Sequence, residues 1–169
     1  MDGQQIEWTL DYQFKVDDFK LSRKTSFSAH HGTSLTFNVD IDEDILFENP
    51  RHAIRAIFNP ESSWLDPSTD FEKAFKVAKM GFDFAEMLVR EIRKSLIEDD
   101  EISELPEYEY QIDSFRLLIL EPLQEEYESR WQDVFAKEGY LDSDENILEV
   151  QQMITTELNQ LNEFQYSKS

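Results

Sequence analysis

Hydrophobic and polar residues alternate strictly near the start of the chain, which predicts a β-strand with one face on the core. The apolar positions of this stripe are Ile6, Trp8, Leu10, Tyr12, Phe14 and Val16. A second, less regular strand is predicted from Phe19 to His31, and a third from the alternation of Leu35, Phe37, Val39 and Ile41. Short connections and one-sided alternation favour an antiparallel meander.

Proline and asparagine punctuate the part that follows. Asn49-Pro50 is typical of an N-cap followed by proline at the first helical position, so a short helix is predicted over residues 50–58. Asn59-Pro60 and Asp66-Pro67 should end regular structure on either side of Trp64.

A long amphipathic helix is the clearest element of the middle of the chain. Thr69 to Glu72 matches a capping box, and apolar residues then recur at steps of three and four as far as about Ile97. This stripe consists of Phe71, Phe75, Ala78, Phe82, Ala85, Val89, Ile92 and Leu96. The charged residues between them are of both signs and are expected to be exposed. Glu72 precedes Lys76, and Glu86 precedes Arg90, by the four residues that favour an ion pair.

The last third is acidic and mainly helical. Residues 98–109 form an acidic connector that Pro106 interrupts, and the apolar run in 110–120 predicts a buried strand, with a helix as the alternative. Two further helices are predicted, one from Pro122 to Gly139 and one capped by Ser143.

These elements predict one α+β domain over residues 1–169. An N-terminal antiparallel sheet of three to four strands packs on the long helix within residues 1–97, and a strongly acidic, mainly helical part with two helices follows in 98–169.

The negative charge is concentrated in that second part. The chain has 169 residues and a net charge of −21, from 37 acidic and 16 basic side chains. Residues 1–94 carry 17 acidic and 12 basic residues, a net of −5, whereas residues 95–169 carry 20 and 4, a net of −16. Most late carboxylates therefore have no cation within their own part of the chain, and unpaired like charge opposes compaction.

The excess charge predicts either a solvated, solubilising face or a surface for a basic partner. Two rows at helical spacing place carboxylates about 5–6 Å apart, close to the separation of successive phosphates along a nucleic-acid strand. The candidate partner-binding residues are Glu98, Asp99, Asp100, Glu101, Glu104, Glu107 and Glu109, with the rows Glu121, Glu125, Glu128 and Asp142, Glu145, Glu149.

No catalytic, cofactor or metal site is predicted. The chain has no cysteine and four glycines, which excludes a thiolate site, a P-loop and a dinucleotide fingerprint. Asp40-x-Asp42-x-Asp44 begins like a calcium loop, but Ile45 and Arg51 stand where glycine and glutamate are needed.

The charge also argues against direct binding of nucleic acid or anionic membranes, since both would repel the chain. The longest aliphatic run, Leu117 to Leu120, is far shorter than the ~20 residues of a membrane helix, and no secretory signal is apparent. We therefore expect a soluble cytoplasmic protein, with a mature secreted domain whose signal has been removed as the alternative.

These features predict a non-enzymatic acidic protein that inhibits or masks a basic, nucleic-acid-handling target such as a nuclease. This chain is similar to phage anti-defence proteins that mimic DNA, and to immunity proteins that block basic nuclease toxins, only in carrying an acidic surface that could bind a basic target. The alternative is a small acidic chaperone or adaptor that binds one protein client through an apolar groove or a sheet edge. Secretion chaperones are similar in size and composition, but they usually begin with a helix. The sequence is also compatible with a homodimer.

Overall fold

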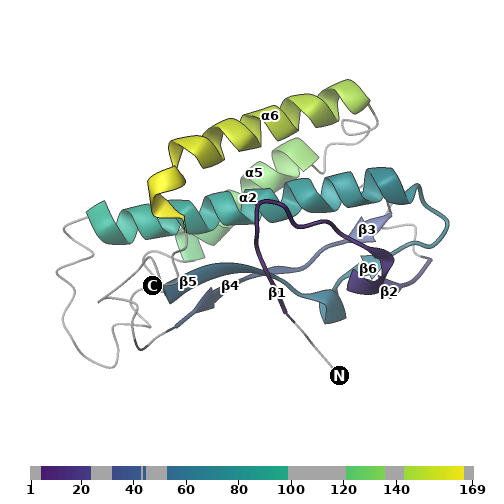
Figure 1. Cartoon of the computed structure of the whole chain (residues 1–169), viewed down its shortest axis with the longest axis horizontal. Helices are drawn as coiled ribbons and strands as arrows, with labels where there is room; N and C mark the ends of the chain where they lie inside the picture. Colours follow the sequence, from purple (N-terminus) through teal and green to yellow (C-terminus); the bar gives the residue numbers. More distant parts are fainter. Residues whose placement is uncertain are drawn as a thin grey trace.

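The computed structural model describes residues 5–23, 32–42, 44, 53–98, 121–135 and 143–165. The α-helices of this part are α2 (Phe71–Glu98), α5 (Glu121–Phe135) and α6 (Asp144–Gln160), and its 3₁₀ turns are η1 (Val16–Asp18), η3 (Pro60–Ser62) and η6 (Asn162–Phe164). Its strands are β1 (Ile6–Glu7), β2 (Lys20–Leu21), β3 (Thr33–Ser34), β4 (Phe37–Ile41), β5 (Ile54–Phe58) and β6 (Trp64–Leu65). The predicted fold class, an N-terminal antiparallel sheet on a long helix with further C-terminal helices, is confirmed (Figure 1).

The sheet that packs on α2 has the strand order β1–β5–β4 and is antiparallel throughout. Its register places Phe58 of β5 between Ile6 and Phe37. A second, smaller sheet has the order β2–β6–β3, in which β2 runs parallel to β6. The predicted meander is therefore wrong in its strand order, because a later strand lies between the first strand and β4.

That central strand, β5, comes from the segment that the sequence predicts to be a short helix. Ile54, Ala56 and Phe58 belong to the core against α2, and Ile57, which points to the other side, is buried as well. A strand buried on both faces gives an almost continuous apolar run, which periodicity cannot distinguish from a helix. Such burial explains why the helix prediction is wrong at 54–58.

The predicted strand over residues 6–16 is confirmed only at Ile6–Glu7. The backbone N–H of Trp8 still donates to Ala56 O at 3.0 Å, and the chain then leaves the sheet and crosses α2 (the purple segment in Figure 1). Phe14 is buried, but Leu10 is 70% exposed, so the prediction that all six apolar residues face the core is wrong at Leu10. The alternation indicates an extended segment with one buried side. Such a segment can form without hydrogen bonds to a neighbouring strand.

The N-terminus of α2 is capped by Asp70, one residue after the predicted position. Its carboxylate accepts from the N–H of Lys73 at 3.4 Å, and its carbonyl accepts from Ala74 at 2.9 Å. Thr69 instead lies against Gly32, whose φ is +84°. A Cβ on that glycine would lie 2.5 Å from Thr69 Cβ, so glycine is required both by its backbone and by the space.

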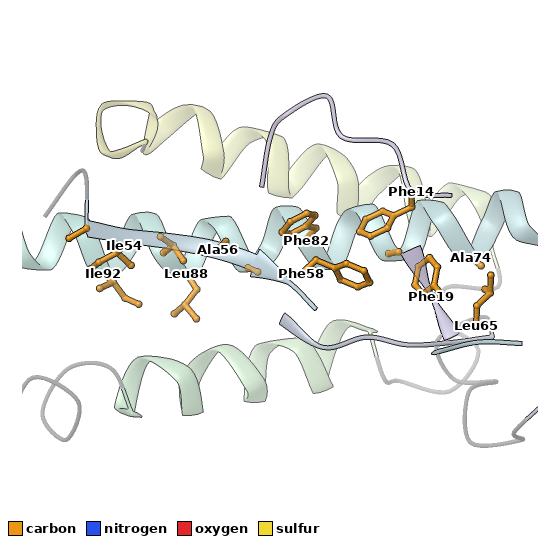
Figure 2. Close-up of a cluster of buried hydrophobic side chains, with 14 residues drawn as sticks. Phe14, Phe19, Ile54, Ala56, Phe58, Leu65, Ala74, Phe82, Leu88 and Ile92 are labelled. Atoms are coloured by element: carbon orange, nitrogen blue, oxygen red, sulfur yellow. The ribbon is translucent and has the colours of Figure 1, made fainter. Parts of the chain in front are cut away.

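Two apolar clusters lie on different sides of α2. The cluster against the sheet includes Phe82 together with Phe14 and Phe58, whose rings are within 6.1 Å of one another (Figure 2). The cluster against α6 consists of Val77, Met80, Phe84 and Met87 with Ile147, Val150, Ile154 and Leu158. The predicted stripe accounts for the first cluster, whereas the second apolar side of α2 is not predicted. An α2 that is covered on two sides is the central element of the fold.

Helix α5 packs on a third position around α2, where Arg130 lies over the ring of Phe84 with 5.4 Å between the guanidinium carbon and the ring centroid. Segment 110–120, predicted as strand or helix, lies outside the described residues.

Candidate functional site

The acidic residues predicted to bind a partner are only partly within the described residues. Exposed carboxylates are found at Glu98, Glu121, Glu125, Glu145 and Glu149, and Glu128 belongs to α5. The other candidates, Asp99, Asp100, Glu101, Glu104, Glu107, Glu109 and Asp142, lie outside the described residues. Assignment of all of them to a partner stays a prediction.

The two acidic rows lie toward opposite ends of α2. Helix α6 runs in the same direction as α2, because the late residue Arg90 reaches Leu158 O, and Figure 1 shows the start of α6 beside the start of α2. Helix α5 runs the other way, since Glu126 neighbours Glu91 while Arg130 lies over Phe84, which is earlier in α2.

The start of α5 therefore lies toward the C-terminal end of α2, where Glu98 is exposed, and the start of α6 lies near Val77. Because Glu126 neighbours Glu91, the two rows are separated along α2 by about the distance from Val77 to Glu91, over which an α-helix rises about 20 Å. The row of Glu121 and Glu125 and the row of Glu145 and Glu149 are consequently two separate surfaces.

Arg130 is held at the junction of the three helices. Its guanidinium lies 3.4 Å from a carboxylate oxygen of Glu91 on α2 and 3.3 Å from one of Glu157 on α6. Burial raises the pKa of Glu91, and the nearby Arg130 opposes that rise. Arg130 is the one basic residue in the sequence of α5, and α6 has none, so the cation of these helices is used in joining them to α2.

A second group of charges forms a stripe along α2 at steps of four, three, four and three. Its members are Lys79, Asp83, Glu86, Arg90 and Arg93. The expectation that the charges of this helix are exposed is wrong here, because Glu86, Arg90 and Arg93 are 2%, 4% and 0% exposed.

Trp8 covers the first half of the stripe. Its indole N–H donates to a carboxylate oxygen of Asp83 at 2.8 Å, and Lys79 donates to the same oxygen at 2.8 Å and to Thr9 O at 3.1 Å. Arg90 lies over the indole ring with 5.3 Å between the guanidinium carbon and the centroid. Burial raises the pKa of Asp83, although Lys79 and the indole hydrogen bond act in the other direction. These contacts hold the segment after β1 across α2.

Arg93 ties the second half of the stripe to the sheet and to the C-terminal turn. It donates to Ile54 O at 3.0 Å, to Glu86 at 3.0 Å and to Phe164 O at 2.9 Å. Arg90 donates to the same oxygen of Glu86 at 3.3 Å and to Leu158 O at 2.6 Å. Buried arginines joined to main-chain carbonyls from different elements fix how those elements meet.

The spacing of these charges places them on one side of α2, and the sequence signal that could have indicated their burial is the presence of apolar residues on two other sides of the same helix. The steps of the charged stripe repeat those of the apolar stripe, and a helix with apolar residues on two sides leaves little room for solvent at the third. Ion-pair spacing alone indicates contact between neighbours and carries no information on burial.

No known protein family, curated protein or solved structure matches this chain. Among the described residues, no three histidine or acidic side chains are grouped to hold a metal ion, and Asp40 of the aspartate pattern is ion-paired with Arg55. In the same part of the chain, no helix has the length and apolar character to cross a membrane.

Proposed function

We propose that this chain is an acidic binding protein, and not an enzyme, that acts in the cytoplasm by occupying the basic surface of a nucleic-acid-handling protein. The proposal rests on the ion pairs of Arg130. This cation is engaged by Glu91 and Glu157 at the helix junction. The exposed carboxylates near the starts of α5 and α6 therefore receive no cation from either helix.

Stabilisation by the helix dipole accounts for only some of these carboxylates. Glu121 and Glu145 lie in first turns, where negative charge is favourable. Glu125 and Glu149 lie one turn further along the same rows, where this effect has faded. Glu125 and Glu149 repel Glu121 and Glu145, and a bound basic surface would relieve that repulsion. The attraction between the opposite charges would also increase the association rate.

The separation of the two rows restricts the geometry of the complex. A basic surface that spans about 20 Å along α2 contacts both rows, as an extended nucleic-acid site would, whereas a smaller one contacts a single row. The proposed partner is accordingly a basic protein, of the kind that anti-defence DNA mimics and immunity proteins block.

The test is affinity capture from a lysate of the source organism, followed by a binding measurement with the captured partner. Two charge reversals, Glu121→Lys with Glu125→Lys and Glu145→Lys with Glu149→Lys, each change one row. The matched control, Glu61→Lys with Glu72→Lys, changes the net charge equally at exposed positions outside both rows. We expect a basic partner that salt, DNA or heparin displaces, and at least one row reversal should weaken binding much more than the control does.

The alternative function predicts a different outcome. A chaperone or adaptor that holds its client in an apolar groove or along a sheet edge would bind almost independently of salt. Equal affinities for the wild type, both reversals and the control would contradict the proposal and favour that alternative.

A further inference from the structure

Two large apolar side chains are exposed on the outer face of α6. Leu148 and Met153 are 54% and 39% exposed, whereas four other apolar residues of the helix are buried on the side that packs on α2. Helix α6, drawn in yellow in Figure 1, lies along the outside of the described structure. Because successive residues of an α-helix are about 100° apart, Leu148 and Met153 lie on either side of the row of Glu145 and Glu149.

The second half of α6 has almost no charge. From Gln151 to Gln160, Glu157 is the one charged residue, and it is ion-paired with Arg130. A face that serves solubility alone should carry charge along its whole length, in a chain of which 31% is charged. Single exposed apolar residues are common on protein surfaces, but the centre of a protein interface is also depleted in charge and enriched in methionine. The outer face around Met153 therefore has the composition of an interface.

Negative charge borders this neutral face at the start of the helix. Glu145 and Glu149 are exposed, and Leu148 lies one turn after Glu145. No residue of α6 is basic, so the helix itself offers no positive charge to these carboxylates. A partner that matches the face carries cations beside apolar side chains. A second copy of the chain is a poor match, because each copy has a net charge of −21 and the two would repel.

We propose that the outer face of α6 binds a cationic amphipathic segment of the partner protein. The lysine or arginine side chains of that segment lie against Glu145 and Glu149, and its apolar side chains cover Leu148 and Met153. This inference rests on the proposed function, assigns the contact to α6, and makes apolar burial a part of the affinity. Charge then raises the rate of encounter, while burial of Leu148 and Met153 slows dissociation.

The probe is a helical peptide of leucine and lysine with its leucines along one side, and its counterpart has glutamine in place of every leucine. Both peptides carry the same charge, so the apolar contact alone distinguishes them. The observable is the side-chain methyl resonance of Met153 in the full-length protein, with those of Met80 and Met87, each 1% exposed, as internal references. We expect the leucine peptide to shift the Met153 resonance in a saturable manner, more than it shifts the references, and to bind at least about tenfold more tightly than the glutamine peptide.

The test variant is Leu148→Gln with Met153→Gln. Glutamine has nearly the helix propensity of leucine and methionine, so these exposed substitutions should leave α6 folded. The matched control, Leu10→Gln with Leu21→Gln, removes apolar side chains that are 70% and 53% exposed elsewhere in the chain. In titration calorimetry, the leucine peptide should bind the α6 variant about tenfold more weakly than the wild type and the control within about twofold of it. The glutamine peptide should not distinguish the three proteins.

A Met153 resonance that the leucine peptide leaves in place, equal affinities for the two peptides, or equal losses in the α6 variant and the control would each overturn this inference. A Met153 resonance that moves with protein concentration alone would overturn it as well, because a second copy would then occupy the face. The proposed function is tested separately, by salt and by the charge reversals with the captured partner. It stands if binding is purely electrostatic, in which case the peptide comparison fails alone.

Discussion

Arg93→Met is the change that tests most directly how the fold is held together. The methionine fills similar space, but it removes every hydrogen bond that Arg93 makes to Ile54 O, Glu86 and Phe164 O. Loss of one partner of a buried ion pair costs about 3–5 kcal/mol, and each carbonyl left without a donor adds about 1–3 kcal/mol. Arg90 still neutralises the charge of Glu86 in the variant, which reduces the cost. We therefore expect Arg93→Met to lower the free energy of unfolding by about 3–5 kcal/mol.

For a domain of this size such a loss should lower Tm by roughly 6–20 °C. Urea unfolding followed by circular dichroism gives the free energy, with Glu72→Gln as the control. The Glu72–Lys76 pair has side chains that are 82% and 50% exposed, and such pairs contribute about 0.3–0.5 kcal/mol. If Arg93→Met cost less than about 1 kcal/mol, or no more than the control, the structural role assigned to the buried stripe would be wrong.

Three further changes test other parts of the structure. Phe82→Ala should cost about 3–5 kcal/mol in urea unfolding, because Phe82 is buried among aromatic rings, and a loss below about 1 kcal/mol would refute its place in the core. Gly32→Ala should cost about 1–3 kcal/mol by the same assay, since its φ is +84° and Thr69 occupies the space, and an unchanged midpoint would contradict this geometry. Burial raises the pKa of Glu91 above 4.5, so its contribution to stability is full below 4.5 and is lost as the pH rises through the folded-state pKa. The wild type should therefore lose more unfolding free energy than Glu91→Gln from pH 4.5 to neutrality, and parallel pH profiles would exclude this effect.

The long helix could be predicted because its apolar stripe repeats over seven turns, so single exceptions do not obscure the pattern. Its observed bounds, Phe71–Glu98, agree with those expected. Strand β5 could not be predicted, because burial on both faces removes the alternation that marks a strand. The segment after β1 shows the opposite case, in which alternation persists although Trp8 binds α2 and not a neighbouring strand.

The candidate site could be predicted only as a set of positions. The exposure of Glu125 and Glu149 agrees with their place on the polar sides of two helices. Their separation along α2 depends on the opposite directions of α5 and α6, which the tertiary contacts of Arg90 and Arg130 show. The burial of Glu86 likewise depends on two packed layers that no local spacing specifies.

The central claim, that the exposed acidic rows exist for a basic partner, is tested most directly by the association rate constant as a function of salt. The measurement compares the wild type with the two row reversals and with the Glu61→Lys, Glu72→Lys control, using the captured partner. Between about 0.1 M and 1 M salt the screening length falls from about 10 Å to about 3 Å. We expect the wild-type and control rates to fall steeply over this range, while at least one reversal is slow at low salt and nearly insensitive to salt. A wild-type rate that is independent of salt, or equal salt dependence in all four proteins, would contradict the account.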